Sequence, residues 1–196
     1  MTPPSLRRDA ARNRDRIVAV ARDLVDEGTP LQLNDVARRT GLGVGTVYRH
    51  FSTAEALMET LAEPCLEALA AHGEQALTET DPWRALESFL HHVVEAQVSD
   101  ASLPAVTAAP TDTLPHTAEL KRFLRSAGTT LLDRARAAEV VRPGLTPADL
   151  VPLMCGIAYA VQVHSGPTVD RVATAHRYLT ALLEGLRAYR PSSAKP

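Results

Sequence analysis

Apolar residues recur at intervals of three and four along almost the whole of this 196-residue chain. Such intervals place side chains on one face of an α-helix, whereas the strict alternation typical of a β-strand is hard to find. The sequence therefore predicts an all-α protein of about nine helices.

Short helices follow the first long one. The first helix carries an apolar stripe that begins at Ile17, and it ends at Gly28, a residue suited to a left-handed cap. Two segments, 34–40 and 44–50, come next, on either side of a turn at 41–43 that contains two glycines. Each is too short to be stable alone, so both must pack on a small core. The candidates for this core are Leu33, Val36, Ala37, Leu42, Val47 and Phe51.

The next helix contains a proline. It begins after Ser52 or Thr53, either of which can cap it. Pro64 removes a backbone donor inside this helix and clashes with the preceding turn, so we expect a kink or a break there. Asp81 and Pro82 then predict an N-cap and the first position of another helix.

The second half of the chain predicts four more helices. Prolines leave room for only one short helix between 99 and 115, and helical periodicity returns at 116–138. The last two helices are expected at 147–164 and 170–189. The first of these is apolar nearly all round, which in so small a protein favours cover by a second subunit. We therefore expect a homodimer in which the last two helices form half of an intermolecular four-helix bundle.

Charge is distributed unevenly. The formal net charge is -2, yet residues 1–22 hold six arginines and only two aspartates. A basic N-terminus on an otherwise acidic chain is typical of a module that touches phosphates at one end, although a solubilising tail gives the same pattern.

Several functional classes are disfavoured. Cys65 and Cys155 form no CxxC pair and no metal-ligand spacing, so we expect no disulfide and no metal site, and a reducing cytoplasm fits best. The chain has no apolar segment of about 20 residues, so we expect no membrane contact. No catalytic residue and no cofactor are predicted, because the common nucleophile, metalloprotease, P-loop and dinucleotide motifs are absent from the sequence. Among non-enzymatic functions, a helical adaptor that never binds DNA stays open as the alternative to the function described next.

The region around the two short helices carries the functional signal. Two short helices joined by a turn with glycine predict a helix-turn-helix, whose second helix enters the major groove of DNA. Residues 36–51 read VARRTGLGVGTVYRHF, and Glu55 and Leu57 follow. This string resembles the DNA-binding region of the TetR family of transcriptional regulators, over roughly residues 12–61. The resemblance implies a DNA-binding domain at 1–52 and a helical ligand-binding and dimerisation domain at 53–196.

The resemblance also implies which residues contact double-stranded DNA. Hydroxyls at Thr46 and Tyr48 suit phosphate oxygens, and the fork of Arg49 suits a guanine edge. The alternatives are that Tyr48 packs in the core, that His50 caps its helix, and that Arg12 belongs to a solvated tail. Ala54 stands where family members usually have lysine, so one phosphate contact is in doubt. The predicted DNA-binding residues are Arg12, Val44, Gly45, Thr46, Tyr48, Arg49 and His50.

A small-molecule effector is a further implication. In this family a ligand in the C-terminal helices weakens DNA binding. The habit of the family favours a repressor released from a palindromic operator, with an activator as the alternative. We hypothesise that Pro64 converts ligand contacts into movement of the DNA-binding heads, with a static kink as the alternative. Since aromatic residues are only 4% of the chain, we expect a mostly aliphatic pocket. The candidate pocket residues, each of which is otherwise a core residue, are Trp83, Phe89, His92, Leu103, His116, Phe123, Met154 and Tyr159.

Overall fold

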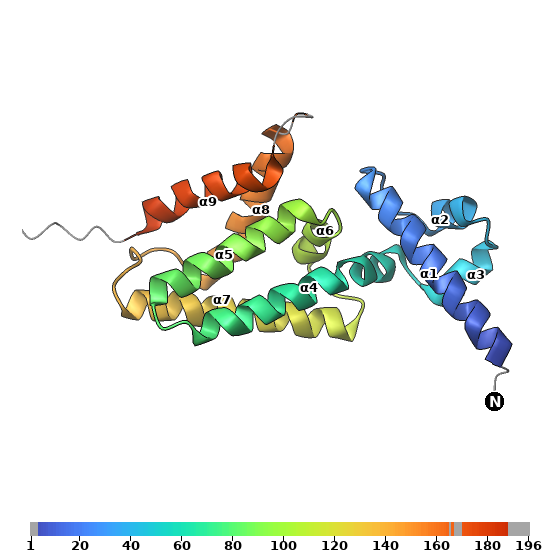
Figure 1. Cartoon of the computed structure of the whole chain (residues 1–196), viewed down its shortest axis with the longest axis horizontal. Helices are drawn as coiled ribbons and strands as arrows, with labels where there is room; N and C mark the ends of the chain where they lie inside the picture. Colours follow the sequence, from blue (N-terminus) through green and yellow to red (C-terminus); the bar gives the residue numbers. More distant parts are fainter. Residues whose placement is uncertain (1–3, 165, 167–169, 188–196) are drawn as a thin grey trace, which may run out of the picture. The chain divides into compact units, whose positions relative to one another are not determined.

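The computed structural model describes residues 4–164, 166 and 170–187, and this part of the chain is all-α (Figure 1). Apart from one isolated bridge between Val141 and Arg187, the described residues form no β-structure. The predicted fold class is confirmed, and so is the number of helices within the described residues. The helices are α1 (Pro4–Asp26), α2 (Leu33–Thr40), α3 (Val44–His50), α4 (Ala54–Thr78), α5 (Pro82–Ser99), α6 (Leu103–Ala108), α7 (Pro115–Ala137), α8 (Pro147–His164) and α9 (Arg171–Leu186).

The chain packs as two compact units. Unit 1 comprises Met1–Leu66 and Asp100–Glu119, and unit 2 comprises Glu67–Ser99 and Leu120–Pro196. The division between the units thus falls within α4, and α6 with the residues around it belongs to unit 1. The boundary at residue 52 was predicted on functional grounds, and it stays a prediction.

The core of unit 1 gathers the faces of its first four helices. Ile17 and Leu24 of α1, which are 0% and 1% exposed, pack with Val36, Val47 and Leu57. This packing explains how α2 and α3, too short to be stable alone, become fixed in place. Five of the six residues predicted for this core are buried, and the sixth packs against it partly exposed: Leu33, Val36, Ala37, Val47, Phe51 and Leu42.

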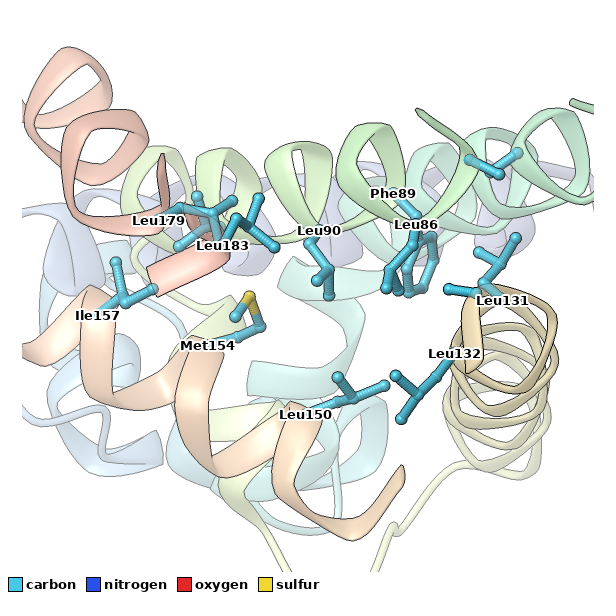
Figure 2. Packing of buried hydrophobic residues seen from close by; sticks show 14 of the residues in the cluster. Leu86, Phe89, Leu90, Leu131, Leu132, Leu150, Met154, Ile157, Leu179 and Leu183 are labelled. Atoms are coloured by element: carbon cyan, nitrogen blue, oxygen red, sulfur yellow. The ribbon is translucent and has the colours of Figure 1, made fainter. Parts of the chain in front are cut away.

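The core of unit 2 surrounds α5. Leu86, Phe89 and Leu90 of α5 lie among buried side chains of α7, α8 and α9, as Figure 2 shows. Two glycines, Gly73 and Gly128, lie next to the Phe89 ring. A Cβ added at Gly73 would lie 3.6 Å from Phe89 Cε2, and one added at Gly128 would lie 3.4 Å from Phe89 Cε1. The labelled partners from the other helices are Leu131, Leu132, Leu150, Met154, Ile157, Leu179 and Leu183.

Side-chain caps begin several helices where the sequence predicts them. Asp81 Oδ1 accepts hydrogen bonds from the amides of Trp83 and Arg84 at 2.9 and 3.0 Å, which begins α5 as predicted. Thr53 Oγ1 accepts a bond of 3.1 Å from the amide of Ala56, so it is Thr53 that caps α4.

Pro64 does not break α4. The helix runs without interruption from Ala54 to Thr78, so the break that the sequence suggested is wrong. A proline inside a helix costs about 3 kcal/mol. Leu61 and Leu66, on either side of it, are 1% and 0% exposed, and we attribute the continuity of the helix to their burial. A hinge at Pro64 stays a prediction. In the described part of the chain, no helix combines the length and the apolar character needed to cross a bilayer.

Candidate DNA-binding site

The turn between α2 and α3 is fixed by hydrogen bonds and by one glycine. Gly41 ends α2 with φ of +68°, a left-handed conformation that favours glycine. The buried Thr40 hydroxyl donates to the Val36 carbonyl at 2.8 Å and accepts from the Leu42 amide at 3.3 Å. The left-handed Gly41 and the hydrogen bonds of Thr40 therefore fix the direction in which α3 follows the turn.

The two faces of α3 differ sharply. Val47 is 0% exposed and holds the helix on the core of unit 1. Val44 and Tyr48, one turn apart on the outer face, are 49% and 47% exposed. The alternative that Tyr48 packs in the core is therefore wrong. Contact of Val44 and Tyr48 with DNA stays a prediction.

Gly45 has no internal reason to be glycine. A Cβ added there would meet nothing within 4 Å, and its φ is not in the left-handed region. A larger residue would also suit the helix better, since glycine costs about 0.5–1 kcal/mol relative to alanine. What the missing side chain provides is open space at the first turn of α3.

Arg49 lies along the outer face of its own helix. Its Nε donates to the Gly45 carbonyl at 3.1 Å, and its Nη2 donates to the Thr46 hydroxyl at 3.1 Å. Both bonds are exposed, and they use only two of the five guanidinium N–H donors. Three of the predicted contact residues are thus brought together at one place on α3.

The two remaining predicted contacts are His50 and Arg12. His50 is half-buried in the last turn of α3, so its alternative role near the negative end of the helix stays open. Arg12 is exposed on α1. Because α1 already begins at Pro4, the described part of the basic segment is helical. Arg14 on the same helix packs over the Phe51 ring, with 5.2 Å between its Cζ and the ring centroid.

The arginines of α2 have partners within the protein. Arg39 donates to both carboxylate oxygens of Glu27 at 2.9 and 2.7 Å, and these bonds hold the pKa of Glu27 below its ordinary value. Arg38 pairs with Asp35 at 2.8 Å. The sequence alone did not single out these pairs. They neutralise charge on α2 and leave Arg12 and Arg49 as the predicted cationic contacts of α1 and α3.

A second set of contacts ties α1 to the segment around α6. Arg22 donates to Asp100 at 2.8 Å, to the Ser102 hydroxyl at 3.4 Å and to the Leu61 carbonyl. Asp100 also accepts from the amide of Ser102 at 2.9 Å. The ion pair spans 78 residues of sequence. No local pattern at Arg22 pointed to it.

Glu59 makes a similar attachment from α4. This carboxylate is buried, with 4% of the residue exposed, and accepts from the amides of Thr113 and Leu114 at 2.6 and 2.8 Å. The sequence did offer a sign of this attachment, because an acidic residue lies between the apolar residues Leu57 and Leu61 and a buried carboxylate needs hydrogen-bond partners.

The predicted effector-binding residues fall into two groups. Trp83, Phe89 and Met154 are buried in the core of unit 2, and Phe123 packs against it partly exposed. His92 is half-buried beside them on α5, where its ring stacks on a neighbouring histidine.

The other predicted effector contacts lie elsewhere. His116 and Leu103 belong to unit 1, where the exposed His116 lies 3.7 Å from a Glu63 carboxylate oxygen and Leu103 is fully buried. Tyr159 is 68% exposed on α8. A role in effector binding stays a prediction for every residue in both groups.

Comparison with known families agrees with this geometry. Residues 17–61 match the family model described as "Bacterial regulatory proteins, tetR family". Residues 81–188, more than half of the chain, match the model described as "Transcriptional regulator SbtR-like, C-terminal domain".

Solved structures show the same fold. The TetR transcriptional regulator SCO0520 from Streptomyces coelicolor is 31% identical, with a TM-score of 0.54, over 90% of this chain and 99% of that chain. The ketosteroid transcriptional regulator KstR2 of Mycobacterium tuberculosis is 16% identical, with a TM-score of 0.63, over 90% of this chain and 96% of that one. At this identity, the second likeness shows the fold alone.

Curated relatives match over a shorter length. The HTH-type transcriptional regulator SAR0097 of Staphylococcus aureus (strain MRSA252) is 30% identical over 80 residues, which are 39% of this chain and 42% of the relative. This chain thus spans about two fifths of the length of the curated relatives it matches.

Proposed function

Because the chain belongs to the TetR family of DNA-binding transcriptional regulators, which are not enzymes, we propose that it acts as a repressor. It binds a palindromic operator as a homodimer, and a small molecule held by its C-terminal helices releases it. The proposal places the protein in the cytoplasm, with the DNA it controls.

The observation that carries the proposal is the division of α3 into two faces. Val47 fixes the helix on the core, while Val44, Tyr48 and Arg49 share an exposed surface. A valine can contact the methyl group of thymine, and an arginine fork can bond guanine O6 and N7 together. An adaptor that never binds DNA would have no use for this combination.

The proposed dimer rests on the exposed apolar residues of α8. Val151, Tyr159 and Val163 lie on one side of that helix and are 42%, 68% and 71% exposed. A second copy of α8 and α9 would cover them in a four-helix bundle. Two-fold symmetry would then match the two halves of a palindrome.

Dimerisation is tested by sedimentation. Val163→Asp places a charge in the proposed interface, so the variant is expected to sediment as a monomer at concentrations where the unaltered protein is a dimer. Val44→Asp is the matched control, since it adds the same charge to another exposed valine. If Val163→Asp stays dimeric, the interface lies elsewhere.

The repressor role is tested by transcription in vitro. Genomic fragments that the purified protein retains supply the promoter, and transcripts are measured with increasing protein. A repressor lowers the transcript level, whereas an activator raises it. Small molecules are then added one class at a time, and an effector is a compound that restores transcription and lowers DNA affinity together. An unchanged transcript level would contradict regulation at that promoter.

A further inference from the structure

Four of the seven histidines of the chain gather around α5 in unit 2. His92 stacks on His72 of α4, with 3.9 Å between ring centroids. His91 packs almost perpendicular to His176 of α9, with 4.8 Å between centroids. Glu95, one turn after His91, brings Oε2 to 3.4 Å from His176 Nε2. The proposed function uses neither His91 nor His176.

We propose that His91, Glu95 and His176 form a binding site for a divalent transition-metal ion of the zinc class. Residues four apart share one face of a helix, so α5 offers an imidazole and a carboxylate together. The facing helix α9 supplies the second imidazole. Two imidazoles and one carboxylate are a ligand set that Zn²⁺ accepts, with a fourth position for water.

The separation of two donor atoms and the separation of the two rings fit a tetrahedral ion. Bonds of about 2.0–2.2 Å to nitrogen and oxygen place two such donors about 3.4 Å apart and the centroids of two bound imidazoles about 5 Å apart. The separation of His176 Nε2 from Glu95 Oε2 is 3.4 Å, and the two ring centroids are 4.8 Å apart. The His91 ring has to turn, because its nitrogens are not yet within 4.8 Å of both other donor atoms.

One donor atom makes no hydrogen bond. His176 Nε2 is buried and makes no hydrogen bond, although Glu95 lies nearby. A buried polar atom without a hydrogen bond is unfavourable, and a metal bond would satisfy it.

The site lies close to solvent. The side chains of His176 and Glu95 are 37% and 49% exposed, so an ion can approach the Glu95 carboxylate from solvent, while Nε2 of His176 is buried beside it.

The other histidine pair supplies a control. His92 Nδ1 bonds to the Ser88 carbonyl at 2.8 Å, so this ring nitrogen already has a partner on its own helix. A change at His92 is therefore expected to leave metal binding intact.

The test is titration of the full chain without a histidine tag. After removal of metal with a chelator, Zn²⁺ is added at pH 7.5 in a calorimeter, and Co²⁺ is added separately to record its visible absorption. We expect one ion per chain, an intense Co²⁺ spectrum of tetrahedral type and a higher Tm, since an ion that binds only the folded state stabilises it.

Variants assign the ligands. His176→Gln and Glu95→Gln are expected to weaken Zn²⁺ binding by at least about tenfold, whereas His92→Gln leaves it unchanged. Circular dichroism checks that each variant is folded. Because the Glu95 side chain is exposed, the Glu95→Gln variant tests the ligand without disturbing the packing of the core. Absence of Zn²⁺ binding, or equal binding by Glu95→Gln, would overturn the proposal. Both results are independent of DNA binding.

Discussion

Arg49 Nη2 lies 3.1 Å from the Thr46 hydroxyl, so the base-reading candidate of α3 is held against its own helix. A second bond, from Nε to the Gly45 carbonyl, completes this arrangement. Hydrogen bonds of this kind contribute about 0.5–1.5 kcal/mol net, and these two are exposed. DNA can therefore replace them at small cost, and the side chain is already directed along the surface that faces the groove in our proposal.

Replacement of Arg49 by alanine is expected to relax sequence preference. A bidentate bond to guanine contributes about 1–3 kcal/mol of discrimination, so binding should weaken on the operator and change little on a site with that base pair altered. Fluorescence anisotropy with a panel of single-base variants measures this. Arg84→Ala, at an exposed position of α5, removes the same charge as a control. An equal loss on every sequence would assign Arg49 to phosphate instead.

Gly45→Ala is expected to raise the stability of the protein and to lower its affinity for DNA. The added methyl group meets nothing within 4 Å, and alanine favours a helix over glycine by about 0.5–1 kcal/mol, so the free energy of unfolding should rise. Affinity for the operator should fall, because the methyl group occupies the space that DNA approaches. Urea unfolding and DNA titration are compared on the same sample. Higher stability with unchanged affinity would show that this turn does not approach DNA.

Much of the secondary structure was predictable because its signals are local. The bounds of α3, the burial of Val47 and the cap at Asp81 all follow from residues within one or two turns of each other. The continuity of α4 through Pro64 did not follow, because packing around the proline outweighs the local preference.

Contacts between distant segments were not predictable from one sequence. The partner of Arg22 is 78 residues away, and the partners of Glu59 are 54 and 55 residues away. The spacing of His91 and Glu95 can be read from the sequence. That His176, on another helix, lies next to them cannot. The sequence therefore predicted no metal site.

Asp100→Asn tests the attachment of α1 to the segment around α6. Asparagine keeps the shape of the side chain but removes the charge that faces Arg22 across 2.8 Å. A hydrogen bond to a charged group contributes about 1.5–3 kcal/mol, and the partial exposure of both side chains places the expected loss of stability at the lower end. Urea unfolding measures it.

The control for this attachment is Asp133→Asn. Asp133 pairs with Arg136 at 3.4 Å on the surface of α7, where such pairs contribute about 0.3–0.5 kcal/mol. Equal small losses for the two variants would mean that the Arg22 pair adds no more stability than a surface pair.

The pH dependence of stability is expected to include a contribution from His91. Its pKa in the folded protein lies below 6.5, chiefly through burial and then through His176 and His92, which outweigh the opposing charges of Glu87 and Glu95. The unfolded chain therefore takes up a proton first as the pH falls below 6.5. The contribution of His91 to stability is therefore fully present above pH 6.5, and it is lost as the pH falls from 6.5 to the pKa of His91 in the folded protein.

His91→Asn removes this contribution. In the presence of a chelator, the slope of stability against pH between 6.5 and lower values should become shallower than in the unaltered protein. His164→Asn, an exposed histidine of α8, should leave the slope as it is. An unchanged slope in the His91 variant would show that this histidine titrates alike in both states.

Selection of bound duplexes from a random pool, at two salt concentrations, tests the central claim most directly. The account predicts enrichment of one palindrome with half-sites about 34–36 Å apart, and affinity that falls steeply as salt rises. Recovery of no enriched sequence, with equal binding to scrambled duplexes, would contradict the assignment of the outer face of α3 as a reader of DNA.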